Sequence, residues 1–135
     1  MIDIDLLIDN IDKYQNISDI NDFKTEILKR YLYFFVINDG SFKSVTEIVW
    51  TSKARPVNIP TISEGKEIYG VLYATKKVAL SHKENRFRIA SLKGLAALDM
   101  MRKLKDVTKV IVQGTNSFVY LDHKEIDDII NKYRA

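Results

Sequence analysis

The two histidines, and the serine beside one of them, come closest in this sequence to a hydrolase pattern. Ser81 directly precedes His82, whereas His123 lies on a different predicted element. A nucleophilic serine needs a strained, glycine-flanked turn that aims its hydroxyl at the histidine, and adjacent residues in a loop do not provide that geometry. A zinc site on a helix would need a second histidine four residues away, which neither has. The sequence therefore predicts two solvated surface histidines, no catalytic residues and no metal site.

Carboxylates with a nearby lysine give a second pattern, that of a metal-dependent nuclease. Such an enzyme clusters acidic ligands around a divalent cation and uses a lysine to stabilise the charge that develops on phosphate. Asp39 together with Glu64 and Lys66 imitates this arrangement. However, Glu64 and Lys66 flank Gly65 in a predicted turn, which holds such groups less rigidly than a strand does. A nuclease is therefore the least favoured hypothesis, and no cofactor is predicted.

Basic residues around one aromatic side chain give the strongest ligand-binding pattern. The group consists of Lys76, Lys77, Lys83, Arg86, Phe87 and Arg88. Cationic side chains beside an aromatic ring can bind and stack nucleic-acid bases, and the same charges can steer association with an acidic protein. The net charge of +3 is modest beside that of a dedicated nucleic-acid module. We therefore predict Lys83, Arg86, Phe87 and Arg88 as partner-binding residues, with a protein favoured as the partner and a solvated charged face as the alternative without a ligand.

A second basic group lies at the end of a later predicted helix. Its members are Arg102, Lys103, Lys105 and Lys109. Cations are common at helix C-termini because they interact favourably with the helix dipole. This group therefore indicates a solvated helix end more than a binding surface.

The composition excludes several classes of protein. The chain has no cysteine, which removes disulfides, thiolate zinc sites, iron–sulfur ligation and cysteine nucleophiles. It contains neither a dinucleotide-binding glycine motif nor a phosphate-binding loop. Its apolar runs are far shorter than the roughly 20 residues that span a bilayer, and its N-terminus is acidic where a signal peptide is basic. With 135 residues, 46% of them hydrophobic, we expect a single domain over residues 1–135 and a soluble, cytoplasmic protein without membrane contact.

Hydrophobic periodicity, turn residues and capping residues divide the chain into helices and strands. Helices are predicted at residues 4–14, from 21 or 22 to about 30, 76–80, from a Ser91 cap to about 104, and 123–133. Strands are predicted at residues 31–37, 45–50, 67–74, 109–112 and 118–121. Residues 38–40 and 64–66 are predicted turns, 55–60 an extended proline-containing stretch, 81–85 a polar loop, and 86–90 an alternating polar and apolar stretch. The pattern predicts an α+β fold, a layered structure with helices packed on a mixed sheet.

A few single residues carry more specific predictions. Thr75 and Ser91 are each predicted to cap a following helix. Asp122 and Glu125 have the spacing of a capping box, with aspartate in place of the more usual serine or threonine. Gly70 lies inside a predicted strand, which indicates a bulge or a close approach of another segment.

The order of elements resembles that of the SseB N-terminal-domain family. The similar motifs are Leu-Lys-Gly-Leu at 92–95, Val-Ile-Val-Gln-Gly at 110–114, Val-Tyr-Leu at 119–121 and Ile-Asp-Asp-Ile-Ile at 126–130. The resemblance covers about residues 23–133 and departs where an Asn-Pro pair is common and this chain has Gln113-Gly114. It implies an α/β domain without an established catalytic residue set, found in bacterial proteins, some of which look like partner-binding or toxin-immunity modules. No site residues carry over.

These observations favour a non-enzymatic bacterial protein-binding domain. Its more specific form is an immunity protein that binds and neutralises a cognate toxin, with Lys83, Arg86 and Arg88 facing an acidic surface. The alternative from another class is a nucleic-acid-binding domain that uses the same cations together with Phe87. The metal-dependent nuclease is the third hypothesis.

Overall fold

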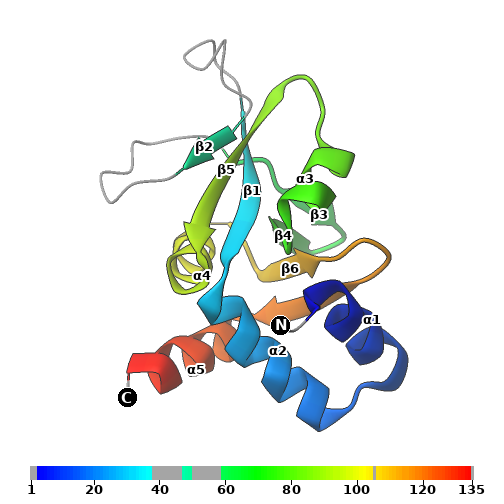
Figure 1. Cartoon of the computed structure of the whole chain (residues 1–135). Helices are drawn as coiled ribbons and strands as arrows, with labels where there is room; N and C mark the ends of the chain where they lie inside the picture. Colours follow the sequence, from blue (N-terminus) through cyan, green and yellow to red (C-terminus); the bar gives the residue numbers. More distant parts are fainter. Residues whose placement is uncertain (1–2, 38–46, 50–58, 105, 135) are drawn as a thin grey trace.

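The computed structural model describes residues 3–37, 47–49, 59–104 and 106–134 (Figure 1). Within these ranges the helices are α1 (Ile4–Tyr14), α2 (Ile17–Lys29), α3 (Lys76–His82), α4 (Gly94–Lys103) and α5 (His123–Arg134). The strands are β1 (Tyr31–Ile37), β2 (Glu47–Val49), β3 (Ile62–Glu64), β4 (Glu67–Tyr73), β5 (Phe87–Lys93), β6 (Lys109–Gln113) and β7 (Phe118–Asp122). These elements form a mixed sheet with helices packed on it, which confirms the predicted α+β fold.

The sheet has the strand order β2-β5-β1-β4-β6-β7, with β3 added to β4. The β2–β5 and β4–β6 pairs are parallel, and the other pairs are antiparallel. One edge of β4 pairs with β6 along residues 69–73, so both β3 and β1 must pair with its other edge. On that edge β3 pairs with residues 67–69, and β1 is in register with β4 only at Tyr33 and Tyr73. The β1 strand therefore diverges from β4 beyond this point and continues beside β5.

The two faces of the sheet are covered differently (Figure 1). One face packs against α1, α2, α4 and α5 and forms the main hydrophobic core. Side chains alternate along each strand, so the even-numbered residues 32, 34 and 36 of β1 point into this core. The opposite face carries a smaller cluster that includes Val78 and Ala79 of α3. We call these the helix-covered face and the aromatic face.

The second helix begins earlier than predicted, at Ile17 instead of residue 21 or 22. Asn16 caps it, because its Oδ1 accepts a hydrogen bond of 2.8 Å from the Ser18 amide. The first helix ends where Gln15 adopts a left-handed conformation with φ of 51°. The polar break between the two helices is therefore shorter than the sequence pattern suggested.

Ser91 does not cap a helix, which corrects a second prediction. It is a buried residue of β5, opposite Tyr33 in a ladder that joins all seven residues of β1 and β5. Helix α4 begins only at Gly94, after Lys93, which makes no side-chain capping bond. A Cβ atom at Gly94 would lie 1.6 Å from the Ile27 carbonyl oxygen, so only glycine lets this junction pack against α2.

Other local predictions are confirmed. The Asp122 carboxylate accepts a bond of 2.8 Å from the Glu125 amide, and the Glu125 carboxylate accepts one of 3.3 Å from the Asp122 amide. These bonds form the predicted capping box at the start of α5. Gly70 is a point of close approach, because a Cβ atom there would lie 2.7 Å from the Met101 sulfur. Thr75 caps α3 through a bond of 3.2 Å from the Val78 amide.

The remaining differences concern strands and turns. Strand β3 was not predicted, and it turns back into β4 through Gly65, which has a φ of 62°. The predicted strand at 45–50 is described only at Glu47–Val49, where it is β2. The predicted turn at 38–40, and most of the extended stretch at 55–60, lie outside the described residues.

The N-terminal helix is attached to the β6–β7 hairpin. The Asp5 carboxylate accepts bonds from the Thr115 amide at 3.0 Å and the Thr115 hydroxyl at 2.7 Å. The Asp9 carboxylate accepts a bond from the Ser117 hydroxyl. Two segments more than 100 residues apart in sequence are therefore joined by three hydrogen bonds.

Candidate functional site

A row of stacked side chains lies on the aromatic face. The Arg86 guanidinium lies 4.7 Å from the centre of the Phe87 ring, and the Phe87 and Phe35 rings stack with centres 5.3 Å apart. The Phe35 and Tyr73 ring centres are 4.7 Å apart, and Tyr73 and His82 are 5.5 Å apart. Such distances are those of favourable aromatic and cation–π contacts. We call these five residues the ring row.

Strand register brings the ring row together from segments that are far apart in sequence. Phe87 lies opposite Ile37 across the β1–β5 ladder, which places Phe35 diagonally beside it. The single β1–β4 register point, between Tyr33 and Tyr73, brings Tyr73 to the other side of Phe35. Helix α3 follows β4 directly and carries His82 at its end.

The ring row borders a groove of about 320 Å³. Its other walls are Pro60, Thr61, Ile62, Val71 and Glu84. Val71 comes from β4, Glu84 from the turn between α3 and β5, and the other three from the segment that enters β3, where β1 has diverged from β4. We call this space the aromatic groove.

One titratable group of the groove, the Tyr73 phenol, is held in its protonated form. Burial raises the pKa of the Tyr73 phenol to about 12, and the nearby Glu84 carboxylate adds to this rise. The phenol therefore keeps its proton at neutral pH and is a hydrogen-bond donor there, not a base. Glu84 itself accepts a bond of 3.0 Å from the Arg86 Nε.

Two of the four predicted partner-binding residues, Arg86 and Phe87, line the groove. Lys83 is half-buried at the end of α3, where its amide bonds to the Leu80 carbonyl. The Arg88 guanidinium donates to the Phe87 and Asn85 carbonyls at 3.2 and 3.4 Å, so part of its bonding capacity holds the turn before β5. The four residues are neighbours in one turn, but they do not form one uniform surface.

Most of the chain's excess positive charge lies in the segment that supplies His82, Glu84, Arg86 and Phe87 to this groove. Residues 76–88 contain five lysine or arginine residues and one glutamate, a net charge of +4, whereas the whole chain carries +3. The rest of the chain therefore has a net charge of −1. We call residues 76–88 the basic segment; Lys76 and Lys77 at its start are exposed.

The second basic group is largely neutralised. Arg102 forms two bonds of 3.0 and 3.3 Å to Asp127, and Lys103 lies 3.0 Å from Asp99. These pairs line an open cavity of about 530 Å³ between α4 and α5. Lys105 lies outside the described residues. This region is therefore a less attractive site for an anionic partner than the basic segment.

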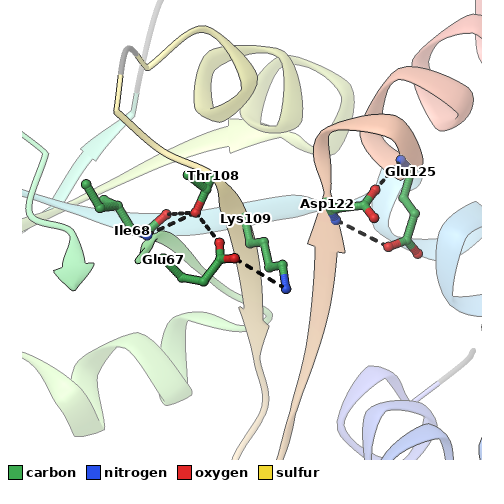
Figure 2. A network of polar contacts seen from close by, with 6 residues as sticks. All are labelled: Glu67, Ile68, Thr108, Lys109, Asp122 and Glu125. Carbon is green, nitrogen blue, oxygen red and sulfur yellow. Dashed lines mark hydrogen bonds and ion pairs between the residues drawn. The ribbon is translucent and has the colours of Figure 1, made fainter. Parts of the chain in front are cut away.

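Lys109 belongs to a polar network at the other end of β4 from the groove. Figure 2 shows the Thr108 hydroxyl between Glu67 and Ile68, and its bond to the Glu67 carboxylate is 2.5 Å long. Thr108 Oγ1 also accepts from the Ile68 amide at 2.9 Å, and Lys109 lies 3.9 Å from the Glu67 carboxylate. These contacts fasten β4 to the start of β6, a structural role that the sequence pattern did not reveal.

The hydrolase and nuclease patterns do not assemble in the described residues. The Ser81 hydroxyl donates to the Val78 carbonyl of its own helix at 2.7 Å, and both Ser81 and His82 belong to α3 instead of a loop. Glu64 lies opposite Glu67 in the β3–β4 hairpin, and Asp39 falls outside the described ranges. Among the residues that the structure describes, no three histidine, aspartate or glutamate side chains are placed to hold a metal ion.

The two histidines differ in their exposure to solvent. His82 is exposed, as predicted, although its ring also stacks on Tyr73. The prediction that His123 is solvated is wrong for its Nε2 atom, which is buried and has no hydrogen-bond partner among the described residues. His123 lies in the first turn of α5 and lines the cavity between α4 and α5.

Phe35 and Tyr73 are the two aromatic residues of the groove that the sequence pattern did not assign to a site. Both lie in predicted strands, and they are only 6% and 8% exposed. The alternation of side chains along a strand could have indicated Phe35. Tyr31, Tyr33 and Phe35 occupy every second position of one strand, so they share one face of the sheet. Of these three, Tyr31 is exposed and has the Lys93 ammonium 4.8 Å from its ring centre.

Comparisons of the chain with family models, curated protein sequences and solved structures found no match. No helix in the described ranges is long and apolar enough to cross a lipid bilayer. The resemblance to the SseB N-terminal-domain family, drawn from sequence motifs, therefore stays a prediction.

Proposed function

We propose that this protein is a non-enzymatic protein-binding domain that uses its basic segment to recognise an acidic surface on a partner protein. The observation that carries the proposal is the concentration of charge in residues 76–88, which exceeds the net charge of the whole chain. Complementary charge speeds encounter and selects between partners. The aromatic groove beside this segment adds apolar contact area of the kind that anchors protein interfaces.

A protein partner suits the groove better than a nucleic acid does. Phe35, Tyr73 and Phe87 are each less than 10% exposed, because they stack mainly on one another. Single-strand binders instead present open aromatic faces on which bases stack.

The more specific form of the proposal is an immunity protein that covers the active site of a cognate toxin. The resemblance to the SseB N-terminal-domain family supports this form, since some of its members look like immunity modules. A basic recognition segment would suit a toxin with an acidic surface around its active site.

A pull-down from native lysate tests the protein-binding function. The tagged protein is compared with the double variant Lys83→Glu and Arg86→Glu, which reverses two charges and leaves Arg88 in place to hold its turn. The matched control reverses two exposed lysines of α5, Lys124→Glu and Lys132→Glu. We expect one stoichiometric protein with the wild type and the control, and its loss with the double variant.

Two results would contradict the proposal. Equal recovery of the partner with the double variant and the control would exclude the basic segment as its binding surface. Recovery of nucleic acid alone, lost as the salt concentration rises, would favour the nucleic-acid-binding alternative, because phosphate contacts weaken steeply with salt.

A further inference from the structure

We propose that the aromatic groove binds an extended acidic segment of the partner that carries one bulky apolar side chain, and that Glu84 weakens this binding in the unmodified protein. This inference rests on the proposed protein-binding function and deepens it. It assigns the apolar contact to the groove and the carboxylate contact to Arg86.

The shape and lining of the groove favour one inserted side chain. At about 320 Å³ it lies at the small end of the range for ligand pockets, too small for a large cofactor. Its apolar walls include Phe35, Val71 and Phe87, and Ile62 is 52% exposed at its entrance. An aromatic or large aliphatic side chain can bury its surface there.

The path of the chain favours an extended segment as the ligand. The groove lies where β1 leaves β4, and its opposite wall is Pro60, Thr61 and Ile62, the segment that leads into β3. It is therefore bordered by β1 and β4 on one side and by the segment that enters β3 on the other. An extended peptide fits between strand walls and can place alternate side chains inward and outward.

Arg86 supplies the charge at the rim of the groove. Its guanidinium lies over Phe87, and among the residues that the structure describes it is bonded to Glu84 through Nε. A guanidinium has five N–H donors, so the remaining donors can bind a carboxylate of the partner. The Tyr73 phenol, protonated at neutral pH, adds a neutral donor to the same groove.

Glu84 is the one acidic residue of the basic segment. Its side chain is 59% exposed and that of Arg86 is 73% exposed, so water already screens their ion pair. A partner carboxylate at Arg86 would lie near the Glu84 carboxylate and be repelled by it. Removing the charge of Glu84 should therefore strengthen the binding of an acidic segment.

Defined peptides test this inference directly. The probe is a fluorescein-labelled dodecapeptide of glutamate and aspartate with one central phenylalanine, measured by fluorescence anisotropy at low ionic strength. One comparison peptide replaces the phenylalanine with alanine, and another replaces the acidic residues with glutamine. The protein variants are Glu84→Gln, Ile62→Ser at the groove entrance, and Asp128→Asn, which removes one exposed charge from α5 as a control.

We expect the phenylalanine peptide to bind about tenfold more tightly than the alanine peptide, because a buried aromatic anchor dominates such contacts. The glutamine peptide should not bind measurably. Glu84→Gln should tighten binding about threefold to tenfold, and Asp128→Asn should change it less than about twofold. Ile62→Ser should remove most of the advantage of the phenylalanine peptide, with folding checked by circular dichroism.

Three results would overturn the inference: no binding of the acidic peptides, equal binding of the phenylalanine and alanine peptides, or an affinity for Glu84→Gln no tighter than for Asp128→Asn. The pull-down separates this failure from a failure of the proposed function. The charge reversals at Lys83 and Arg86 could abolish recovery of the natural partner while Ile62→Ser and Glu84→Gln recover as much of it as the wild type does. In that case the protein-binding function stands, and the groove is excluded as the binding site. If no variant and no wild-type protein recovers a partner, the function itself fails.

Discussion

Phe34 and Phe35 are neighbours on β1, yet they belong to two differently built faces of the sheet. Phe34 is fully buried in the helix-covered core, which consists mostly of aliphatic side chains from four helices and the strands. Phe35 lies on the aromatic face, in a row of rings with a groove beside it and charged residues at its rim. One face is closely packed around Phe34, and the other leaves an open groove with charged residues at its rim.

Truncation of these two neighbours measures the difference. Phe34→Ala should lower the free energy of unfolding by about 3–5 kcal/mol, because it leaves a closed cavity in the core. Phe35→Ala should lower it by about 3 kcal/mol or less, because the lost ring borders a groove that is already open. Urea denaturation of both variants provides the measurement. A larger loss for Phe35→Ala would mean that the aromatic face is the main source of stability.

Substitutions that add atoms to each face should give the next largest difference in the free energy of unfolding. Gly94→Ala places a methyl group against the Ile27 backbone, which cannot move aside as a flexible side chain can, so we expect a loss of about 3 kcal/mol. Val71→Ile adds one methylene at the wall of the groove, and should change stability by less than about 1 kcal/mol. Thermal unfolding of the two variants tests this. Equal losses would show that the groove has no spare volume.

The alkaline pH dependence of stability should report in part on the aromatic face, through Tyr73. Burial also raises the pKa of Tyr69, so a second tyrosine contributes to this dependence. The Tyr73 pKa is about 12 in the folded protein and near 10 in an unfolded chain, so the folded state holds this proton more tightly. The resulting stabilisation is complete below pH 10 and is lost as the pH rises towards 12. Between pH 10 and 12 the free energy of unfolding of Tyr73→Phe should therefore fall by about 1–2 kcal/mol less than that of the wild type, allowing for solvent screening. Tyr133→Phe, at a residue that is 61% exposed, is the control and should leave the alkaline loss unchanged.

The rim charges of the groove should contribute least to stability. Glu84→Gln breaks an exposed ion pair, and should change the free energy of unfolding by less than about 0.5 kcal/mol. The same variant should have a clear effect on peptide affinity, which separates binding from folding. A loss of more than 1 kcal/mol in urea denaturation would instead make the Glu84–Arg86 pair a structural contact of the turn.

Local sequence patterns predicted the parts of the fold that local interactions determine. The Asp122 cap of α5 depends on residues three apart, and it is present as predicted. Ser91 has equally good capping chemistry, but the continuous β1–β5 ladder extends the strand past it, and tertiary pairing prevails. The sequence predicted only part of the groove. Phe87 could be identified because basic residues surround it in the sequence, whereas Phe35 and Tyr73 come to lie beside it only through strand register. Register between distant segments is not encoded in any short window of sequence.

The attachment of α1 to the β6–β7 hairpin has a consequence for the protein during its synthesis. The Asp5 contact with Thr115 spans 110 residues. Helix α1 therefore leaves the ribosome long before the β6–β7 hairpin, to which it is attached, has been synthesised. At typical translation rates this delay is about 5–20 s. During that interval the apolar side of α1, with Ile4, Leu7 and Ile8, has no hairpin to cover it. A nascent chain of this protein is therefore exposed to chaperones and to aggregation until its last quarter has been translated.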